Sequence, residues 1–209
     1  MATPRAGAAF DAFLPKATER SRAQRAWQQQ DGALPAIFLS HGAPPLFDDG
    51  PWLEHLPDCA LTLPKPTAVL LVSAHWESAP LALSAAQAAP PLVYDFGGFD
   101  PRYFGMKYAT PDASVLAALV ESLIPDHQQL HRHPSRGLDH GAWVPLKAMY
   151  PIGDVPTLQL SLPTHRPDRL VELGRRLAPL REQGVLIIGS GFMTHGLPSL
   201  TGDMIHLGK

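Results

Sequence analysis

The sequence predicts an α/β fold: a single domain with a mostly parallel central sheet and helices flanking both faces. From residue 35 onward, short apolar runs recur along the chain, and amphipathic stretches separate several of them. The runs are rich in leucine and β-branched residues, as is typical of strands buried on both faces of a parallel sheet. Strands that alternate with helices predict such a sheet. At 209 residues, the chain is long enough for one domain with a substantial core.

Six strands are expected in chain order, near residues 36–40, 67–74, 80–84, 128–132, 155–162 and 185–190. Helices are expected over residues 113–124, 142–150 and 166–183. The first has apolar residues at helical spacing, whereas the second is less clearly periodic. In the third, leucines line one face, Pro167 suits the first turn and Gly184 the C-terminal stop. Pro179 should bend or shorten its last turn.

The first 34 residues differ in composition, because alanine is frequent and basic residues outnumber acidic ones. The acidic residues argue against a transit peptide, and the absence of a continuous apolar segment argues against a secretory signal. We expect residues 1–34 to form an N-terminal extension, either a surface helix or a flexible segment. Residues 35–209 are expected to form the α/β domain.

A long loop from Ala86 to Thr110 carries six aromatic residues interleaved with glycines. Structureless loops of this length are uncommon in compact domains and are often functional. Its aromatic side chains could line a pocket for a planar ring. They could equally pin the loop to the body of the domain.

The charge balance and the cysteine content limit which binding partners and which cellular compartment are expected. Lys and Arg number 17 against 19 Asp and Glu, so neither nucleic acid nor an anionic membrane is an expected partner. The longest apolar runs are strand-sized, so no membrane helix is expected. Cys59 is the only cysteine and cannot form an internal disulfide, which favours a cytoplasmic protein.

Three histidines each follow a short apolar run: His41, His75 and His195. Ligand sites in open α/β sheets gather beyond the carboxyl ends of the strands. A fourth, His140, lies in a glycine-flanked loop before an expected helix. A single histidine at a strand end is usually just hydrogen-bonded or solvated, but the recurrence favours a metal site. With no thiolate ligand pair and no HExxH, GxSxG, GxGxxG or Walker motif, this site suits Fe(II), Zn(II) or Mn(II).

Six motifs follow one another over about residues 35–200: Ser40-His41-Gly42, Ser73-Ala74-His75-Trp76, Tyr94-Asp95-Phe96-Gly97-Gly98-Phe99, Gly137-Leu138-Asp139-His140-Gly141-Ala142-Trp143, Gln159-Leu160-Ser161, and Gly189-Ser190-Gly191 through His195. The series resembles that of class III extradiol ring-cleaving dioxygenases, in particular the bacterial 4,5-DOPA-extradiol-dioxygenase-like proteins. The resemblance implies one divalent metal ion, Fe(II) for catalysis or Zn(II) as in related proteins. It also implies O₂-dependent opening of a small aromatic diol, such as a DOPA-like catechol.

By position, the resemblance implies that His41 and His75 bind the metal. His195 matches a histidine that acts as a ligand in some members and as the acid/base group in others. His140 matches a histidine that contacts the substrate or moves protons.

Three further residues are candidates for binding the substrate: Tyr94, Phe96 and Asp139. The two aromatic residues belong to the long loop, whose rings could stack on a planar substrate. Asp139 precedes His140 and could orient its ring as a hydrogen-bond acceptor, or could simply be solvated.

The C-terminal part departs from the family. Its members continue well past the His195 motif and there supply a His or Glu to the metal, whereas here only Asp203 and His206 remain as candidates. A shortened domain would leave a sheet edge or apolar surface uncovered, which favours self-association, as in a homo-oligomer, or poor stability. Activity is then expected to be weak or absent unless a partner completes the fold. Zinc as the native metal would favour a non-redox hydrolase or a non-catalytic protein like the Memo-type relatives of this fold. A structural or regulatory interaction protein is the expectation if no metal binds.

Overall fold

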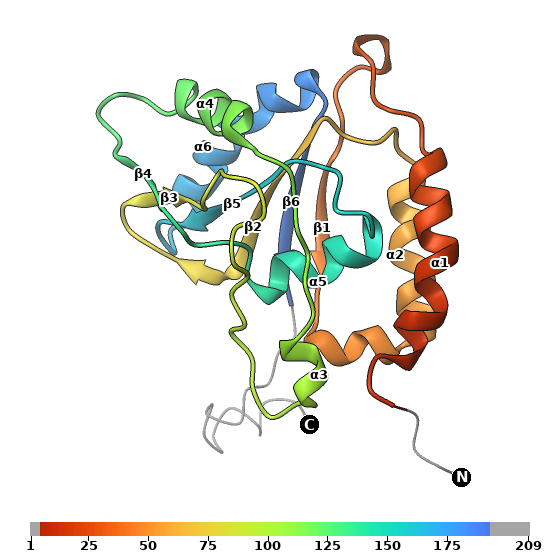
Figure 1. The fold of residues 1–209 in the computed structure, drawn as a ribbon. Helices are drawn as coiled ribbons and strands as arrows, with labels where there is room; N and C mark the ends of the chain where they lie inside the picture. Colours follow the sequence, from red (N-terminus) through yellow and green to blue (C-terminus); the bar gives the residue numbers. More distant parts are fainter. Residues whose placement is uncertain (1–4, 193–209) are drawn as a thin grey trace, which may run out of the picture.

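A six-stranded sheet runs through the middle of the molecule in the strand order β1-β6-β2-β5-β3-β4 (Figure 1). This computed structural model describes residues 5–192. The strands are β1 (Ala36–Ser40), β2 (Ala68–Glu77), β3 (Leu81–Leu83), β4 (Leu130–Arg132), β5 (Thr157–Leu162) and β6 (Val185–Gly191). Neighbouring strands are parallel except β3 and β5, which are antiparallel. The mostly parallel sheet is therefore confirmed, and a strand lies at each of the six expected positions.

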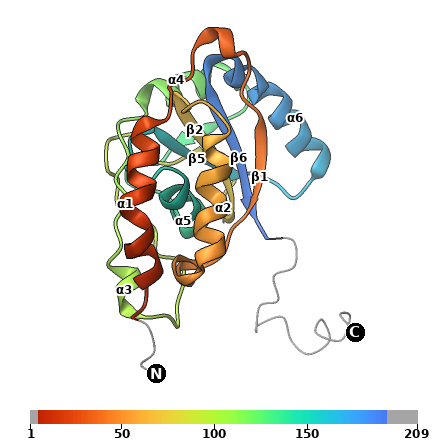
Figure 2. The ribbon, with the colours of Figure 1, turned by 90° about the vertical axis from the view of Figure 1, so that its right-hand side faces the viewer.

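Helices cover both faces of the sheet, as expected (Figures 1 and 2). On one side lie α1 (Ala8–Ala23), α2 (Gly50–Leu61) and α5 (His140–Met149), and on the other lie α4 (Ser114–Ser122) and α6 (Pro167–Leu177). Shorter helices are η1 (Gln29–Asp31), η2 (Pro44–Asp48), α3 (Pro101–Phe104) and η3 (Ala178–Gln183). Among the described residues, no helix has the length and apolar character needed to cross a membrane.

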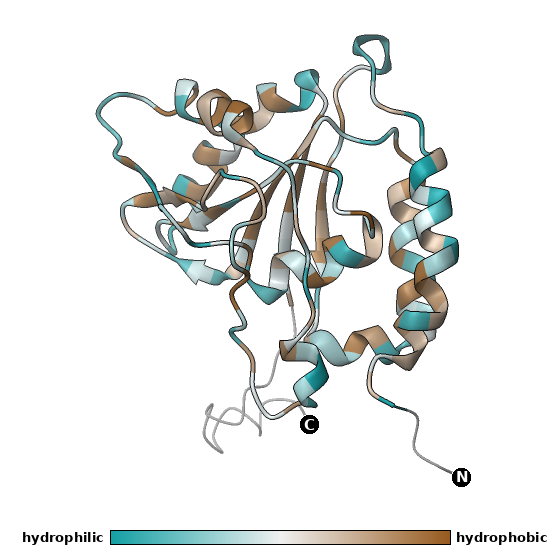
Figure 3. Cartoon of the chain, in the orientation of Figure 1, coloured by the Kyte–Doolittle hydropathy of each residue, from teal (hydrophilic) through white to brown (hydrophobic). Residues whose placement is uncertain are grey.

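Strand β2 shows why the apolar runs are continuous. Val69 and Leu71 belong to the core beneath α1, α2 and α5, whereas Ala68 and Leu70 belong to the core beneath α4 and α6. Successive side chains of a strand point to opposite faces, so both sets are buried when helices cover both faces. Figure 3 shows the result as hydrophobic colouring along the central strands.

Prolines set several helix boundaries. As expected from Pro179, the α-helical part of the last predicted helix ends at Leu177, and η3 continues to Gln183. Gly184 ends η3 with a φ of 75°, a left-handed conformation that favours glycine. Helix α2 was not expected from the sequence, because it contains Pro57 within its span in addition to a proline in its first turn.

The N-terminal segment forms part of the domain. Helix α1 packs on α2, and its Phe10 is buried in the core, 3% exposed. The backbone N–H of Gly7 donates to Asp48 in η2 at 2.9 Å. A helix or a flexible segment was expected here, and the helix is the one observed, over residues 8–23. Burial of its apolar side chains holds it in place.

The carboxyl ends of β1, β6 and β2 lie at the lower edge of the sheet in Figure 1. The first residues of α5 and the loop that leads into α3 lie near the same edge. His41 directly follows β1, and His75 lies within the last residues of β2. The topology thus brings residues that are distant in sequence to one place.

Candidate metal centre

Three histidines converge at this edge. His41, His75 and His140 each offer a ring nitrogen, and these three atoms lie within 4.8 Å of one another. His41 Nε2 is 2.8 Å from His75 Nε2, and the ring centroids of His75 and His140 are 4.0 Å apart. His41 and His140 are buried, 3% and 7% exposed, whereas His75 is more open to solvent. The fourth sequence candidate, His195, lies outside the described residues.

Ser190 near the end of β6 orients the ring of His41. Its hydroxyl lies 2.8 Å from His41 Nδ1 and donates its proton to the carbonyl oxygen of Gly141 at 2.5 Å. A hydroxyl has only one proton to donate, so Ser190 accepts its other bond from His41 Nδ1–H. His41 is therefore the tautomer whose Nε2 carries the lone pair, the form in which an imidazole binds a metal.

Gly141 allows the rings to approach closely. A Cβ atom at this position would lie 2.5 Å from Ser73 Oγ, 2.8 Å from His41 Cε1 and 3.0 Å from His75 Cδ2. Two of these distances are far shorter than van der Waals contacts, and the third is tighter than most. The glycine that follows His140 is therefore required by packing against the two strand-end histidines.

The carboxylate of Asp95 holds His140. One oxygen accepts hydrogen bonds from the ring Nδ1 of His140 at 2.7 Å and from its backbone N–H at 3.1 Å. The other oxygen lies 3.8 Å from His75 Nδ1. Burial alone would raise the pKa of Asp95, but the bonds from His140 outweigh it, so this pKa is lowered and the group is ionised near neutral pH. A negative charge is also favourable at the N-terminus of α5.

Asp139 has a different environment from the one expected. Its side chain is 0% exposed, Gln159 Nε2 donates to its carboxylate, and its own backbone N–H donates to Gln159 Oε1 at 3.1 Å. Burial raises the pKa of Asp139. The bond expected from Asp139 to the His140 ring is made by Asp95 instead. A role for Asp139 in substrate binding stays a prediction.

The two aromatic candidates pack against α5. Phe96 meets the His140 ring edge-on, at 5.8 Å between centroids and 80° between planes, and lies 6.2 Å from Trp143. The ring centroid of Tyr94 lies 6.0 Å from that of Trp143, and the Tyr94 hydroxyl donates a hydrogen bond to the backbone oxygen of Met106 at 2.6 Å. These contacts attach the loop to the domain, which is one of the two roles expected for its aromatic residues. Stacking of Tyr94 or Phe96 on a substrate stays a prediction.

The same loop is tied to the N-terminal segment. Arg102 of α3 pairs with Asp11 of α1 at 2.5 Å and also donates to the backbone oxygen of Ala6. Tyr103 donates its hydroxyl to Asp48, and burial together with this carboxylate raises the pKa of Tyr103 to about 12. The segment that carries Asp95 is thus anchored on its C-terminal side to α1 and η2.

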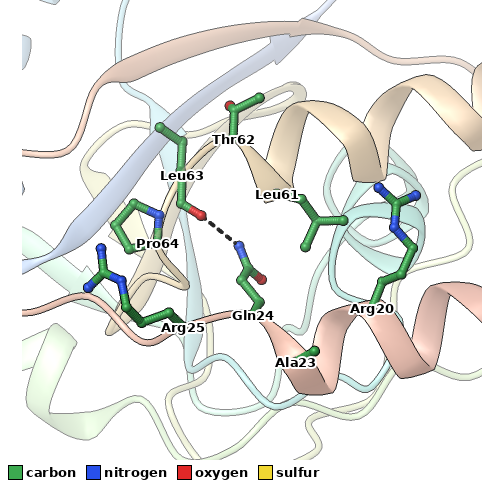
Figure 4. Close-up of a pocket in the computed structure, with 8 residues that line it drawn as sticks. All are labelled: Arg20, Ala23, Gln24, Arg25, Leu61, Thr62, Leu63 and Pro64. Atoms are coloured by element: carbon green, nitrogen blue, oxygen red, sulfur yellow. Dashed lines mark hydrogen bonds between the residues drawn. The ribbon is translucent and has the colours of Figure 1, made fainter.

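A separate surface pocket of about 500 Å³ lies between the end of α1 and the segment after α2 (Figure 4). There Gln24 Nε2 donates to the backbone oxygen of Leu63 at 3.0 Å. Neither a histidine nor a carboxylate lines this pocket, so it offers no ligand set for a metal.

Comparison with known proteins identifies the family. Residues 50–204 match the model described as the catalytic LigB subunit of aromatic ring-opening dioxygenase. The chain belongs to this family. The resemblance noted in the sequence motifs is therefore confirmed at the level of the family.

The relatives include enzymes from bacteria and plants. The 4,5-DOPA dioxygenase extradiol of Escherichia coli K12 is 38% identical over 167 residues, which cover 78% of this chain and 61% of the relative. The protein of the same name from Beta vulgaris is 38% identical over 174 residues, covering 79% and 64%. A crystal structure of an uncharacterized Escherichia coli K12 protein superposes with a TM-score of 0.60 at 29% identity, covering 77% and 61%. The chain thus spans less than two thirds of the length of each.

Proposed function

We propose that this chain binds one divalent metal ion at the histidine cluster and cleaves the ring of a catechol beside its two hydroxyls, using O₂. The observation that carries the proposal is the convergence of His41, His75 and His140 within 4.8 Å, in a chain of a ring-opening dioxygenase family. These histidines come from three separate segments, so only the fold brings them together.

The donor set fits a divalent transition metal. A separation of 2.8 Å between His41 Nε2 and His75 Nε2 is short enough for both to bind one ion at the usual ~2.0–2.1 Å. Imidazole without thiolate suits iron or zinc, and the Ser190 bond leaves the lone pair of His41 on Nε2. We propose His41 and His75 as ligands, with His195 as a further ligand or as an acid/base group. Fe(II) is the metal for this reaction, because Zn(II) has no redox chemistry.

When bound, Fe(II) would supply open coordination positions at which the catechol oxygens and O₂ become neighbours. His140 would supply the proton transfer. Its Nδ1 donates to Asp95, so Nε2 is the nitrogen that can take a proton from a hydroxyl of the diol and later return it. Phe96 covers one edge of the His140 ring and would exclude water from that side. Both atoms of O₂ end in the ring-opened product, so no outside reductant is needed.

The names of the relatives, which refer to 4,5-DOPA, support a catechol as the proposed substrate class. A DOPA-like catechol is therefore the first compound to test, followed by protocatechuate and homoprotocatechuate. We expect protein supplied with Fe(II) under air to consume O₂ and form a yellow ring-opened product from at least one of them.

Metal content and O₂ consumption should be measured on the same sample. Protein that holds iron but consumes no O₂ with any of the three catechols would overturn the proposal. Tight zinc binding without O₂ uptake would instead support the non-redox zinc hydrolase or the non-catalytic metal-binding protein.

A further inference from the structure

The long aromatic loop contributes one charged group to the centre, the carboxylate of Asp95. Its two oxygens lie between His75 and His140: Oδ1 is 2.7 Å from Nδ1 of His140, and Oδ2 is 3.8 Å from Nδ1 of His75. Asp95 lies 45 positions before His140 in the chain, so the loop brings this carboxylate to the centre.

A single oxygen of Asp95 holds His140 twice. Oδ1 accepts from the backbone N–H of His140 as well as from its ring. The backbone bond fixes the carboxylate relative to the first turn of α5, and the ring bond then fixes the rotation of the imidazole relative to the same turn. Because Nδ1 carries the donated proton, the lone pair of the neutral ring lies on Nε2.

We propose that Asp95 is a positioning residue that holds His140 as the Nδ1–H tautomer, so that Nε2 accepts the proton of the bound aromatic diol. This inference rests on the proposed function. Carboxylates that orient a histidine in this way are common beside metal centres and in catalytic dyads.

The neighbouring carboxylate does not take this role. Asp139 precedes His140 in sequence, but its carboxylate accepts from Gln159 of β5 and lies 3.8 Å from Arg136. Asp139 thus fixes the start of α5 against the sheet, whereas Asp95 fixes the ring.

The loop is built to hold Asp95 in place. Tyr94 and Phe96, on either side of it, both pack against Trp143 of α5, and Tyr94 also donates to Met106 O. Two aromatic anchors therefore flank the carboxylate. A rigid flank is what a positioning group requires, because a small displacement of the ring would misplace the proton acceptor.

The test uses Asp95→Asn, which keeps the size of the side chain but removes the charge and one acceptor oxygen. Asp100→Asn is the matched control: it lies on the same loop, and Asp100 caps α3 by accepting from Arg102 N, which asparagine does equally well. Asp95→Glu restores the carboxylate. The first readout is the ¹⁵N NMR signal of the His140 ring nitrogens in the metal-free protein, and the second is kcat and KM with Fe(II) and a catechol.

We expect wild type and Asp100→Asn to show a proton on Nδ1 of His140, and Asp95→Asn to show a mixture of tautomers. We expect kcat to fall about 10–100-fold in Asp95→Asn, with KM and metal stoichiometry unchanged and partial recovery in Asp95→Glu. Unchanged nitrogen signals or an unchanged kcat in folded Asp95→Asn would overturn the inference.

The two proposals fail separately. If wild type binds iron but opens no catechol ring, the proposed function fails, while the nitrogen signals still decide the tautomer. If Asp95→Asn does not fold, the wild-type spectrum decides, because a His140 ring protonated on Nε2 and not on Nδ1 would overturn the role of Asp95.

Discussion

Ser190 Oγ lies 2.8 Å from Nδ1 of His41, although the two residues are 149 positions apart in the chain. Strands β1 and β6 are neighbours in the sheet, with Leu39 opposite Ser190 and Ser40 opposite Gly191. The parallel register therefore places a hydroxyl beside the histidine that follows the adjacent strand. The orientation of His41 depends on this register.

Ser190→Ala should weaken metal binding about 10–100-fold, because it leaves the ring of His41 without its orienting acceptor. Titration of the metal-free protein with Co²⁺ or Zn²⁺ against a competing chelator measures the change. Ser122→Ala is the control, since that hydroxyl bonds only within its own helix end, to Leu119 O. Equal affinities of Ser190→Ala and wild type would show that His41 needs no such support.

His41→Ala or His75→Ala should abolish metal binding, whereas His140→Ala should leave the metal bound and slow turnover. The first two variants remove proposed ligands, and the third removes the proposed proton-transfer group. Elemental analysis of the purified variants, together with O₂ uptake, separates the two effects. His165→Ala, which alters a largely exposed ring, should behave as wild type. Full metal occupancy in both His41→Ala and His75→Ala would refute the ligand assignment.

Gly141→Ala should destabilise the fold by about 1–3 kcal/mol and impair metal binding, because the added methyl group collides with Ser73 and His41. Gly174→Ala in α6 is the matched control. Its Cβ would meet nothing within 4 Å, and alanine favours the helix by up to ~1 kcal/mol. Thermal unfolding of both variants checks the prediction, which requires opposite signs for the two changes in Tm.

The contribution of Asp95 to stability should depend on pH. Its pKa is lowered in the folded protein, so the native state favours the ionised form. This stabilisation is present above the unfolded pKa of 3.8 and is lost as the pH falls through the lowered folded value. Tm measured against pH should therefore show a gap between wild type and Asp95→Asn near neutral pH, which closes below about pH 4. A gap that widens in acid would contradict the assigned direction.

Much of the fold follows from the sequence. Continuous apolar runs located β2 and β6, since a strand covered on both faces needs no polar alternation, and strands lie at the other four expected positions as well. The rule that sites gather at the carboxyl ends of parallel strands correctly predicted that His41 and His75 would meet. Helix α2 could not be predicted in the same way, because Pro57 opposes helix formation locally and packing of its apolar face compensates.

The supporting residues of the centre were harder to predict. Asp139 is next to His140 in sequence, but its backbone is extended just before α5, and its carboxylate accepts from Gln159 and not from the His140 ring. Asp95 reaches His140 across 45 positions through a loop whose path depends on tertiary packing. The sequence motif contained Asp95, yet nothing local to it indicated its partner.

The pairing of Asp11 with Arg102 links helix α1 to the loop that carries Asp95, whose carboxylate accepts a hydrogen bond from the His140 ring. A shorter protein that started at Ala36 would retain His41, His75 and His140 but would lose this ion pair. We therefore expect removal of the first 35 residues to disturb the orientation of His140 more than the positions of His41 and His75.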